Sequence, residues 1–523
     1  MHDQGHRCSS HSRRDEKSTH GGRRFLTRWL IGNSTIAGVF ALLWLLLRSG
    51  TRPSRLAYPC QQAALTSASL ALAAPLAAAV IAARRGLVSS MRRPGRVIAA
   101  ILGVIATIAV WGHVEGVDAT QTWRLQPPSD YRAKVFNVTA CPQQPEGDRF
   151  AGLDRLLELM GRNGLKFYRS SGFSTLAAPD GIIGADDVVL IKINYQWPEL
   201  GGTNTDLLSG LIRAIVDHPD GFSGEIVIVE NTQEHSDGDF HRSENNSQDR
   251  TRSPRHVVRD FADLGHRVSI FGWRGLRRVA VDEFSQGDYS AGYVVLDYDP
   301  DIGGRVSYPK FTSAFGSSIS LRDGIWDSAS ERYDRSRLKF INLPVLKPHS
   351  GEYGYGATAC VKNYMGVVTA RLDTSSHDAI RYGILGAVMR EIGLADINIL
   401  DCIWTSYNPQ WGPWVSYDGH VTRTDQLVAS TDPIAADIWA VRNILVPAFE
   451  ILGFPPEPLP RPSADPDDPE SAFRTYLDNS MQQLLEGGYA VTNDVAAIDV
   501  FSANASRARP NPRRPSRRVG PGG

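Results

Sequence analysis

The run VVLIKI at Val188–Ile193 decides the fold that we predict for this chain. Its residues are aliphatic and mostly β-branched, with one lysine, which is typical of a strand buried on both faces of a sheet. A second run of this kind, EIVIV at Glu225–Val229, follows the helical pattern of Thr205–His218. That helix would have Asn204 or Thr205 as its N-cap. Strand, helix and strand in this order predict a parallel pair joined by a crossover helix.

The region after residue 130 repeats this alternation of short apolar runs and amphipathic stretches. Further strands are expected at Val268–Phe271, Tyr293–Leu296, Lys339–Leu346 and Ile397–Ile403. Further helices are expected at Phe150–Arg162 and His256–Leu264, at His377–Ile392 with Ser375 or Ser376 as cap, and after Asp432–Pro433, where aspartate is the cap and proline opens the first turn. We therefore predict an α/β fold with a largely parallel or mixed sheet and helices on both faces.

The N-terminal part predicts transmembrane helices before this domain. Trp29–Leu47 carries no charge and approaches the ~20 residues that span a bilayer. Ala63–Ala83 and Val97–Gly112 are weaker apolar segments. The positive-inside rule places the N-terminus and the arginine-rich loop Arg84–Arg96 in the cytoplasm, so three crossings leave the main domain outside. Two crossings would reverse that orientation, and a cleaved signal peptide is the alternative for the first segment.

Changes in composition divide the chain into five parts. We expect a basic cytoplasmic N-terminus at 1–28, a membrane region with up to three helices at 29–112, an α/β domain at 130–454, a linker and C-terminal helix at 455–500, and a disordered basic tail at 501–523. A solvated tail is the expectation, although its charge would also suit anionic lipid or cell-wall polymers. Lys+Arg and Asp+Glu both number 56, so the net charge gives no sign of specific nucleic-acid binding.

The five cysteines include no CxxC pair, so neither a zinc ribbon nor a ferredoxin-type iron–sulfur cluster is encoded. The sequence thus names no cofactor. In an exported domain, Cys141, Cys360 and Cys402 could include one disulfide. Cys360 is better explained as a small buried group than as a nucleophile, because no partner at motif spacing activates it.

Polar side chains gather at the carboxyl ends of the predicted strands. Ligands of open α/β sheets bind outside these ends, so we expect the side chains to surround one cleft. They are Lys192, Asn194, Glu230, Asn231, Lys347, His349 and Asp401, joined by Lys362, Asn363 and His377. Three lysines in one cleft would bind a carboxylate or a phosphate. No G-x-x-x-x-G-K-[ST], G-x-S-x-G or H-E-x-x-H motif occurs, which disfavours common nucleotide enzymes and hydrolases.

The roles that we assign follow from the chemistry of these groups. The candidate catalytic residues are Lys347, His349, Lys362 and Asp401, because a crowded lysine loses basicity and can act as a base or nucleophile. The candidate binding residues are Lys192, Asn194, Glu230, Asn231, Asn363 and His377. Glu230 and Asp401 could instead hold a divalent cation, so a metal remains open and unassigned. Each residue also has a structural alternative: a salt-bridged surface lysine, a loop cap for Asp401, and a structural or exposed His377.

The order of these motifs resembles a known family of uncharacterised bacterial and archaeal proteins, the domain-of-unknown-function family 362. The resemblance is carried, over roughly residues 187–445, by VVLIKIN, VIVEN, LPVLKPH, ACVKNYMG, His377, ILDCI, Gly412-Pro413 and STDPIAAD. YPCQQA at Tyr58–Ala63 is similar to the membrane-bound members. Several members look like iron–sulfur proteins with added cysteine repeats, which this chain lacks. The resemblance therefore supports the choice of site residues and implies no particular reaction.

Two kinds of function follow from the sequence. The first is a membrane-anchored, extracytoplasmic domain that binds or transforms a small anionic substrate in a cleft lined by Lys, His, Asp and Glu. The second is a non-catalytic cell-envelope binding protein, since aromatic residues suited to sugars or peptides cluster in one loop, although ordinary packing also explains them. These aromatic residues are Trp404, Tyr407, Trp411, Trp414 and Tyr417. A metal-binding or redox-associated protein is a third possibility.

Overall fold

The computed structural model describes residues 124–142, 145–195, 202–232, 240, 247–349, 356–372, 374, 376–406, 421–452 and 464–507. The chain divides into two compact units, Met1–Arg124 and Leu125–Gly523. The predicted membrane segments at 29–47, 63–83 and 97–112 lie outside the described residues. Within the described part, no helix combines the length and the apolar character needed to cross a bilayer.

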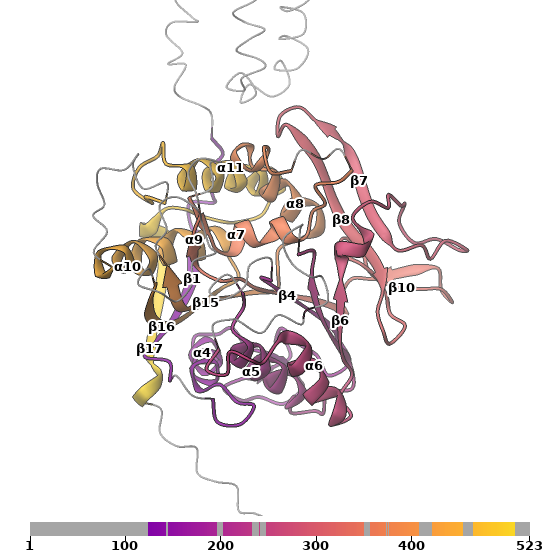
Figure 1. The fold of residues 1–523 in the computed structure, drawn as a ribbon, viewed down its shortest axis with the longest axis horizontal. Coiled ribbons are helices and arrows are strands. Elements are labelled where there is room, and N and C mark those ends of the chain that lie inside the picture. The colour runs from indigo at the N-terminus through magenta and orange to yellow at the C-terminus, as the bar shows by residue number, and fades with distance from the viewer. Residues whose placement is uncertain are drawn as a thin grey trace, which may run out of the picture. The chain divides into compact units, whose positions relative to one another are not determined.

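An eight-stranded mixed sheet forms the centre of the Leu125–Gly523 unit (Figure 1). Its spatial order is β17 (Ile498–Asn504), β1 (Ala133–Thr139), β16 (Val421–Ser430), β15 (Ile397–Ser406), β12 (Leu338–Leu343), β4 (Val188–Ile193), β5 (Glu225–Glu230) and β6 (Val268–Gly272). The strands from β15 to β6 pair in parallel, and β16 runs antiparallel to both of its neighbours. The predicted α/β class with a mixed sheet is confirmed.

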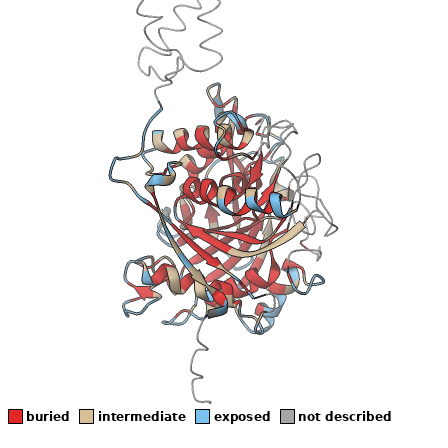
Figure 2. Cartoon of the chain, turned by 90° about the vertical axis from the view of Figure 1, so that its left-hand side faces the viewer, coloured by how far each residue is buried: buried red, intermediate tan, exposed pale blue. Residues whose placement is uncertain are grey.

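The apolar runs that predicted the central strands are buried on both faces of the sheet. In β4, Val188 and Leu190 belong to one hydrophobic core, whereas Val189 and Ile191 belong to the other. This alternation follows from the two-residue period of a strand. Figure 2 shows the sheet as a buried layer between helices. A continuous aliphatic run is what such a two-sided position requires.

Helices cover both faces of the sheet (Figure 1). One face carries α4 (Ala151–Arg162), α5 (Thr205–Val216) and α6 (Pro254–Asp263), and the other carries α7 (Cys360–Asn363), α8 (Ile384–Ile392), α9 (Pro433–Ala440), α10 (Val446–Ile451) and α11 (Ala472–Glu486). Two of the three predicted caps are present, whereas α8 has Gly383 at its N-cap position instead of Ser375 or Ser376. Asn204 accepts the N–H groups of the first turn of α5, and Asp432 accepts those of α9.

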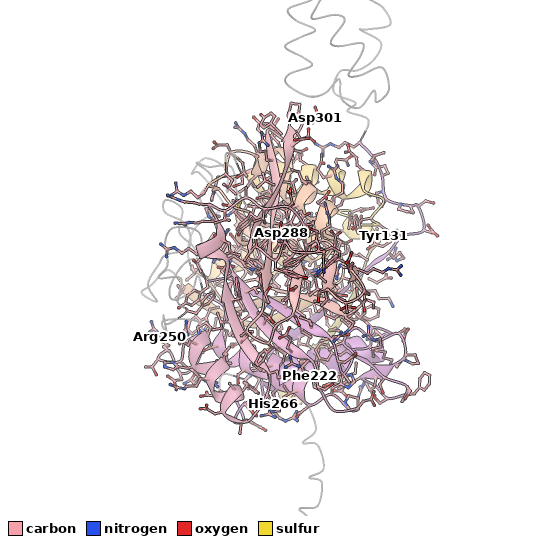
Figure 3. All side chains as sticks on the ribbon, turned by 90° about the vertical axis from the view of Figure 1, so that its right-hand side faces the viewer. Tyr131, Phe222, Arg250, His266, Asp288 and Asp301 are labelled. Atoms are coloured by element: carbon pink, nitrogen blue, oxygen red, sulfur yellow. The ribbon has the colours of Figure 1, made fainter. Side chains whose placement is uncertain are left out.

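A second, antiparallel sheet lies between β6 and β12 in the chain. It consists of β7 (Gly292–Asp299), β8 (Gly304–Thr312), β9 (Ser318–Ser320), β10 (Gly324–Asp327) and β11 (Arg332–Asp334). The predicted strand Tyr293–Leu296 is real but belongs to this sheet rather than to the parallel one. Figure 3 views the unit from this side, with Asp288 and Asp301 labelled.

The helix predicted at His377–Ile392 begins later than expected. Residues 376–379 form a turn, Ile380–Tyr382 form one 3-10 turn, and α8 starts at Ile384. Between them, Gly383 has φ +88°, and a Cβ there would lie 2.6 Å from the carbonyl oxygen of Asn479. Only glycine adopts this conformation without strain, so the chain turns before the helix starts.

The folded part also continues beyond the boundaries expected from composition. Helix α11 lies within the predicted 455–500 segment, and β17 pairs in parallel with β1 along its whole length. A final 3-10 turn, Ala505–Arg507, follows β17. The first residues of the predicted tail are therefore structured, because β17 supplies the edge of the main sheet.

Candidate functional site

A small polar pocket lies where β4 and β5 end. Its lining residues are Asn194, Glu230, Lys347, His349, Thr358, Lys362, Asn363, Met365 and Gly366. Asn194 directly follows β4 and Glu230 ends β5, which is the sheet edge where parallel α/β folds place ligands. The cavity volume of about 20 Å³ exceeds the ~10–15 Å³ that one water molecule needs, so the pocket suits a compact chemical group.

A buried ion pair forms the base of the site. The Lys192 amine contacts the Glu230 carboxylate, and the two side chains are only 1% and 3% exposed. Lys192 Nζ also donates to the carbonyl oxygen of Ile193 at 2.7 Å and to Asn363 Oδ1 at 3.2 Å. Burial lowers the pKa of Lys192 and raises that of Glu230, while the attraction between the two charges opposes both shifts. Because each charge stabilises the other, the pair is neutral as a unit.

Two further lysines enter the pocket from the segment after β12. Lys347 lies in the short strand β13 (Lys347–Pro348), and its Nζ donates to Asn194 Oδ1 at 2.8 Å. Lys362 lies in α7 and is buried. Burial holds the pKa of Lys347 well below its usual range, and the nearby charge of Lys362 lowers it further. Burial lowers the pKa of Lys362 to about 7. Burial therefore disfavours the charged form of both amines.

A chain of amide side chains orients the polar groups of the site. Asn363 Oδ1 accepts from Asn194 Nδ2 at 3.0 Å, and Asn363 Nδ2 donates to Asn342 Oδ1 at 2.8 Å. Asn342 Nδ2 in turn donates to Asn398 Oδ1 at 2.8 Å, across neighbouring strands β12 and β15. A satisfied buried network of this kind fixes side-chain orientation. Sequence reasoning missed Asn342 and Asn398; the signal was a single asparagine inside each of two apolar runs, FINL and INIL.

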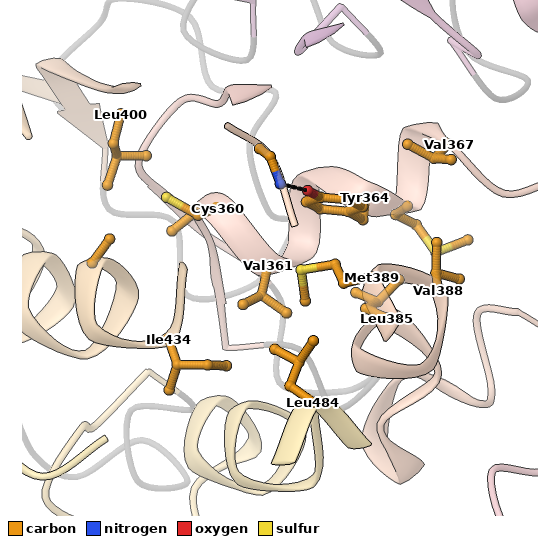
Figure 4. Packing of buried hydrophobic residues seen from close by; sticks show 14 of the residues in the cluster. Cys360, Val361, Tyr364, Val367, Leu385, Val388, Met389, Leu400, Ile434 and Leu484 are labelled. Atoms are coloured by element: carbon orange, nitrogen blue, oxygen red, sulfur yellow. Dashed lines mark hydrogen bonds between the residues drawn. The ribbon is translucent and has the colours of Figure 1, made fainter. Parts of the chain in front are cut away.

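The helix that carries Lys362 is anchored by an aspartate that sequence reasoning also missed. The carboxylate of Asp437, in α9, accepts the N–H groups of Cys360 at 2.7 Å and Val361 at 2.9 Å. These are the first residues of α7, so the carboxylate satisfies donors that a helix start leaves unpaired. Burial raises the pKa of Asp437 to about 7, against the effect of these N–H donors. Figure 4 shows Cys360 and Val361 packed with Ile434 in the same region.

Glycine is required at position 366 by the ion pair. A Cβ at Gly366 would lie 2.3 Å from Glu230 Oε1 and 2.5 Å from Lys192 Nζ. Its carbonyl oxygen accepts the N–H of Asn231 at 3.1 Å. The close approach of backbone and side chains therefore explains the last residue of the VKNYMG motif.

Thr358 is a pocket residue that sequence reasoning did not single out. It lies in β14 (Ala357–Thr358) and pairs with Lys347 across the β13–β14 ladder. Its side chain is 3% exposed, and its Oγ1 has no hydrogen-bond partner among the residues that the structure describes. A buried hydroxyl without a partner is uncommon and calls for an explanation.

The structure brings most of the predicted site residues together. Asn194, Glu230, Lys347, His349, Lys362 and Asn363 line the pocket, and Lys192 lies directly behind Glu230. The three lysines expected to converge therefore surround one site. Lys347 comes from the loop after β12, as the strand-end argument predicted, although it sits in its own two-residue strand.

Three of the predicted residues are not among the described residues that line the pocket. Asn231 is buried behind it, where its Nδ2 donates to Tyr293 Oη and to the carbonyl oxygen of Val368, each at 2.7 Å. Asp401 accepts the N–H groups of Asn204 and Ile403, each at 3.1 Å. His377 lies in the turn before α8.

The described cysteines form neither a disulfide nor part of a metal site. Cys141, Cys360 and Cys402 are buried free thiols, so the disulfide considered among them is not formed. Burial raises the pKa of each thiol, which makes them poor nucleophiles. Within the described ranges, no group of three or more His, Cys, Asp or Glu side chains is arranged to hold a metal ion.

Of the five aromatic residues predicted to form a binding surface, Trp404 lies among the described residues. Trp404 packs against the guanidinium of Arg423, whose central carbon lies 4.9 Å from the ring centroid. The other four members, at positions 407, 411, 414 and 417, lie outside the described residues. Trp404 is thus engaged in packing within the domain, on the two antiparallel strands β15 and β16.

Fold and pocket together define an α/β protein with a lysine-lined polar site at the carboxyl edge of its central sheet. Residues 338–442 match the model of a protein family described as "Domain of unknown function (DUF362)". The resemblance predicted over residues 187–445 is therefore confirmed for this segment, which contains Lys347, Lys362 and Asp437. Lys192 and Glu230 lie outside it. No curated protein and no solved structure matches the chain.

Proposed function

We propose that the domain binds a small anionic ligand between Lys347 and Lys362 and exchanges a proton with it through Lys362. The observation that carries the proposal is the convergence of two buried amines on one polar pocket. Lys347 and Lys362 both line it, at 2% and 7% exposure, and the amides of Asn194 and Asn363 line it beside them. Ammonium groups form strong hydrogen bonds to carboxylate and phosphate oxygens, so this lining suits an anion.

Proton exchange is supported by the environment of Lys362. A group transfers protons most effectively when its pKa lies near the working pH. Burial lowers the pKa of Lys362 to about 7, so its amine and ammonium forms both exist near neutral pH. His349, the half-buried imidazole in the same lining, is a second candidate for this role. Asp401 accepts two backbone N–H groups and its charge also acts on Lys347, so it supports the site without lining the pocket.

The first test is anion binding to the full chain, measured as thermal stabilisation by phosphate, sulfate and small carboxylates. We expect at least one of these anions to raise the unfolding temperature, because a ligand that binds the folded state stabilises it. Lys347→Ala and Lys362→Ala should each remove most of that rise, since each deletes a charged donor.

A matched control is Lys310→Met, which removes a buried lysine from the second sheet. Lys310 is 0% exposed, and its Nζ lies 4.4 Å from the ring centroid of Phe284 rather than in the pocket. Its loss should leave the anion effect unchanged. The proposal fails if the Lys347 and Lys362 variants respond to every anion as the parent does. Anion binding without turnover of any substrate would instead favour the non-catalytic binding protein.

We further propose that the domain is anchored in the membrane and faces away from the cytoplasm. The support is the sequence: an uncharged apolar run at 29–47, two weaker apolar segments, and arginines on the side predicted to be cytoplasmic. A reporter that is active only outside the cytoplasm, fused after residue 125, should be active, whereas the same reporter fused within Arg84–Arg96 should be silent. The reverse pattern would show that the orientation is wrong.

A further inference from the structure

We infer that the ligand of this pocket is an anion that carries a hydroxyl group of its own, and that the carboxylate of Glu230 accepts the hydrogen bond of that hydroxyl. The inference rests on the proposed anion site and names the class of ligand. It is drawn from the acceptor capacity of Glu230, from the backbone beside this carboxylate, and from a buried hydroxyl elsewhere in the lining.

The carboxylate of Glu230 has room for a further hydrogen bond. Its Oε2 accepts the ammonium of Lys192, and its Oε1 accepts the N–H of Thr232 at 3.0 Å. An ionised carboxylate offers about four acceptor positions, so these two described donors leave one on each oxygen. A Cβ at Gly366, another lining residue, would overlap both oxygens, so glycine keeps a side chain away from them. A donor of the ligand can therefore join the two donors of the protein.

The backbone that follows β5 adopts a strained conformation beside this carboxylate. Thr232 has φ +58°, a left-handed conformation that β-branched residues rarely adopt. In this conformation its N–H is donated to Glu230 Oε1. Strain of this kind clusters at functional sites, because the surrounding structure has to compensate for it. The strained turn therefore points to a role for the direction in which the Glu230 carboxylate is held.

A hydroxyl of the lining gives an independent sign of a bound polar group. The Thr358 side chain is 3% exposed, and its hydroxyl makes no hydrogen bond within the described part of the chain. Leaving a buried hydroxyl unpaired destabilises a protein. A polar ligand in the pocket would complete its hydrogen bonding. Because Thr358 lies in β14 and Glu230 in β5, the two observations come from separate elements of the same lining.

An anion without a donor is poorly suited to this lining. Acetate and sulfate present only acceptor oxygens, so an oxygen placed beside Glu230 would meet a second acceptor of the same charge. Repulsion between like charges is strong where water is excluded. A hydroxyl turns the same contact into a charge-assisted hydrogen bond, which is about twice as strong as one between neutral groups. Glu230 therefore selects for an anion with a donor.

A hydroxyl also suits this place better than an ammonium group. The amines of Lys192, Lys347 and Lys362 already lie at the pocket. A further cation would be repelled by each of these lysines that is protonated, and burying its charge would cost free energy. A hydroxyl is neutral and avoids both effects. A 2-hydroxy acid meets this requirement, and so does a phosphoryl group that retains a proton.

The test is calorimetric titration of the full chain near pH 7 with two pairs of anions of similar shape. Glycolate differs from acetate by one hydroxyl, and inorganic phosphate keeps a P–OH group that sulfate lacks. We expect the first member of each pair to bind about tenfold more tightly, because the second cannot donate to the carboxylate. Tighter binding of glycolate than of phosphate would identify a hydroxy acid, and the reverse a phosphoryl group. Glycine, with an ammonium in place of the hydroxyl, should bind more weakly than glycolate.

A charge-balanced variant tests Glu230 itself. Lys192→Met combined with Glu230→Gln removes both charges of the ion pair and keeps a polar group at the base of the pocket. It should reduce the preference for glycolate over acetate from about tenfold to about threefold, because the acceptor becomes neutral. Glu225→Gln is the matched control. Glu225 lies on the same strand, is 1% exposed, and accepts from the Ser313 hydroxyl at the opposite end of β5 from Glu230. This variant should keep the full preference.

The outcomes separate the inference from the proposed function. Equal or tighter binding of acetate and sulfate than of glycolate and phosphate overturns the hydroxyl-bearing ligand and leaves an anion site. Tighter binding of glycine than of glycolate overturns the hydroxyl in favour of an ammonium. An undiminished preference in the double variant overturns the role of Glu230. Failure of all the probes to bind removes both the inference and the proposed function.

Discussion

Replacing Glu230 with alanine is expected to lower the free energy of unfolding by about 3–5 kcal/mol. The reason is the ammonium of Lys192, which is 1% exposed and would lose the carboxylate that compensates its charge. The remaining acceptors of that ammonium, the carbonyl oxygen of Ile193 and Oδ1 of Asn363, are neutral and cannot replace it. Equilibrium denaturation of the full chain, followed by tryptophan fluorescence, measures the loss.

A double replacement distinguishes the lost charge from lost packing. Lys192→Met combined with Glu230→Leu removes both charges and keeps apolar volume, so it should recover most of the stability that Glu230→Ala loses. The recovered protein should still fail to bind anions, because the base of the pocket has changed. If Glu230→Ala costs less than about 1 kcal/mol, the two groups do not form a buried pair.

The central part of this fold could be predicted because its strands are buried on both faces. Runs such as those of β4 and β5 are continuous, aliphatic and β-branched, and no other common element has that composition at that length. Because these strands are parallel, their carboxyl ends lie at the same edge of the sheet. For this reason Lys192, Asn194 and Glu230 could be placed at one site before any coordinates.

Other elements could not be predicted, because their causes are distant contacts. Most of the second sheet escaped prediction, because β9, β10 and β11 are only three or four residues long and β8 contains Pro309, so their pattern resembles loops. The late start of α8 depends on Gly383 meeting the backbone of Asn479, which lies nearly a hundred residues away in the chain. His377 was therefore placed on a helix that does not include it.

The site shows the same division between local and distant causes. Lys347 and Lys362 lie in the motifs LPVLKPH and ACVKNYMG. A charged residue next to a buried apolar run indicates a functional role. Thr358 and Asp437 give no such signal. Thr358 stands out because its hydroxyl is buried and unpaired, and Asp437 because it caps a helix from a different element. Asp437 lies within STDPIAAD. The pattern of that segment is already explained by Asp432 as the N-cap of α9, so it gives no sign of a second role for Asp437.

Removing the amine of Lys362 is expected to make the protein without a ligand more stable at pH 7. The gain in the free energy of unfolding should be about 4 kcal/mol larger at pH 7 than at pH 10.5. Burial lowers the pKa of Lys362 from 10.5 to about 7. Between these values the unfolded chain binds one more proton at this lysine than the folded chain does. Above pH 10.5 the buried amine therefore does not reduce the free energy of unfolding. As the pH falls toward 7 the free energy of unfolding decreases, by at most about 1.4 kcal/mol per pH unit.

The experiment compares the parent with Lys362→Met, since methionine is unbranched and apolar and suits the buried stem. Denaturation curves between pH 7 and pH 10 should show stability rising with pH more steeply in the parent than in the variant. Asp437, whose pKa is raised to about 7, adds a fall in stability with rising pH that ends about one pH unit above 7 and is common to the parent and the variant. Lys134→Met, at an exposed lysine, should run parallel to the parent. Parallel curves for the parent and Lys362→Met would mean that Lys362 keeps its proton in the fold, and the proton exchange proposed for it would lose its basis.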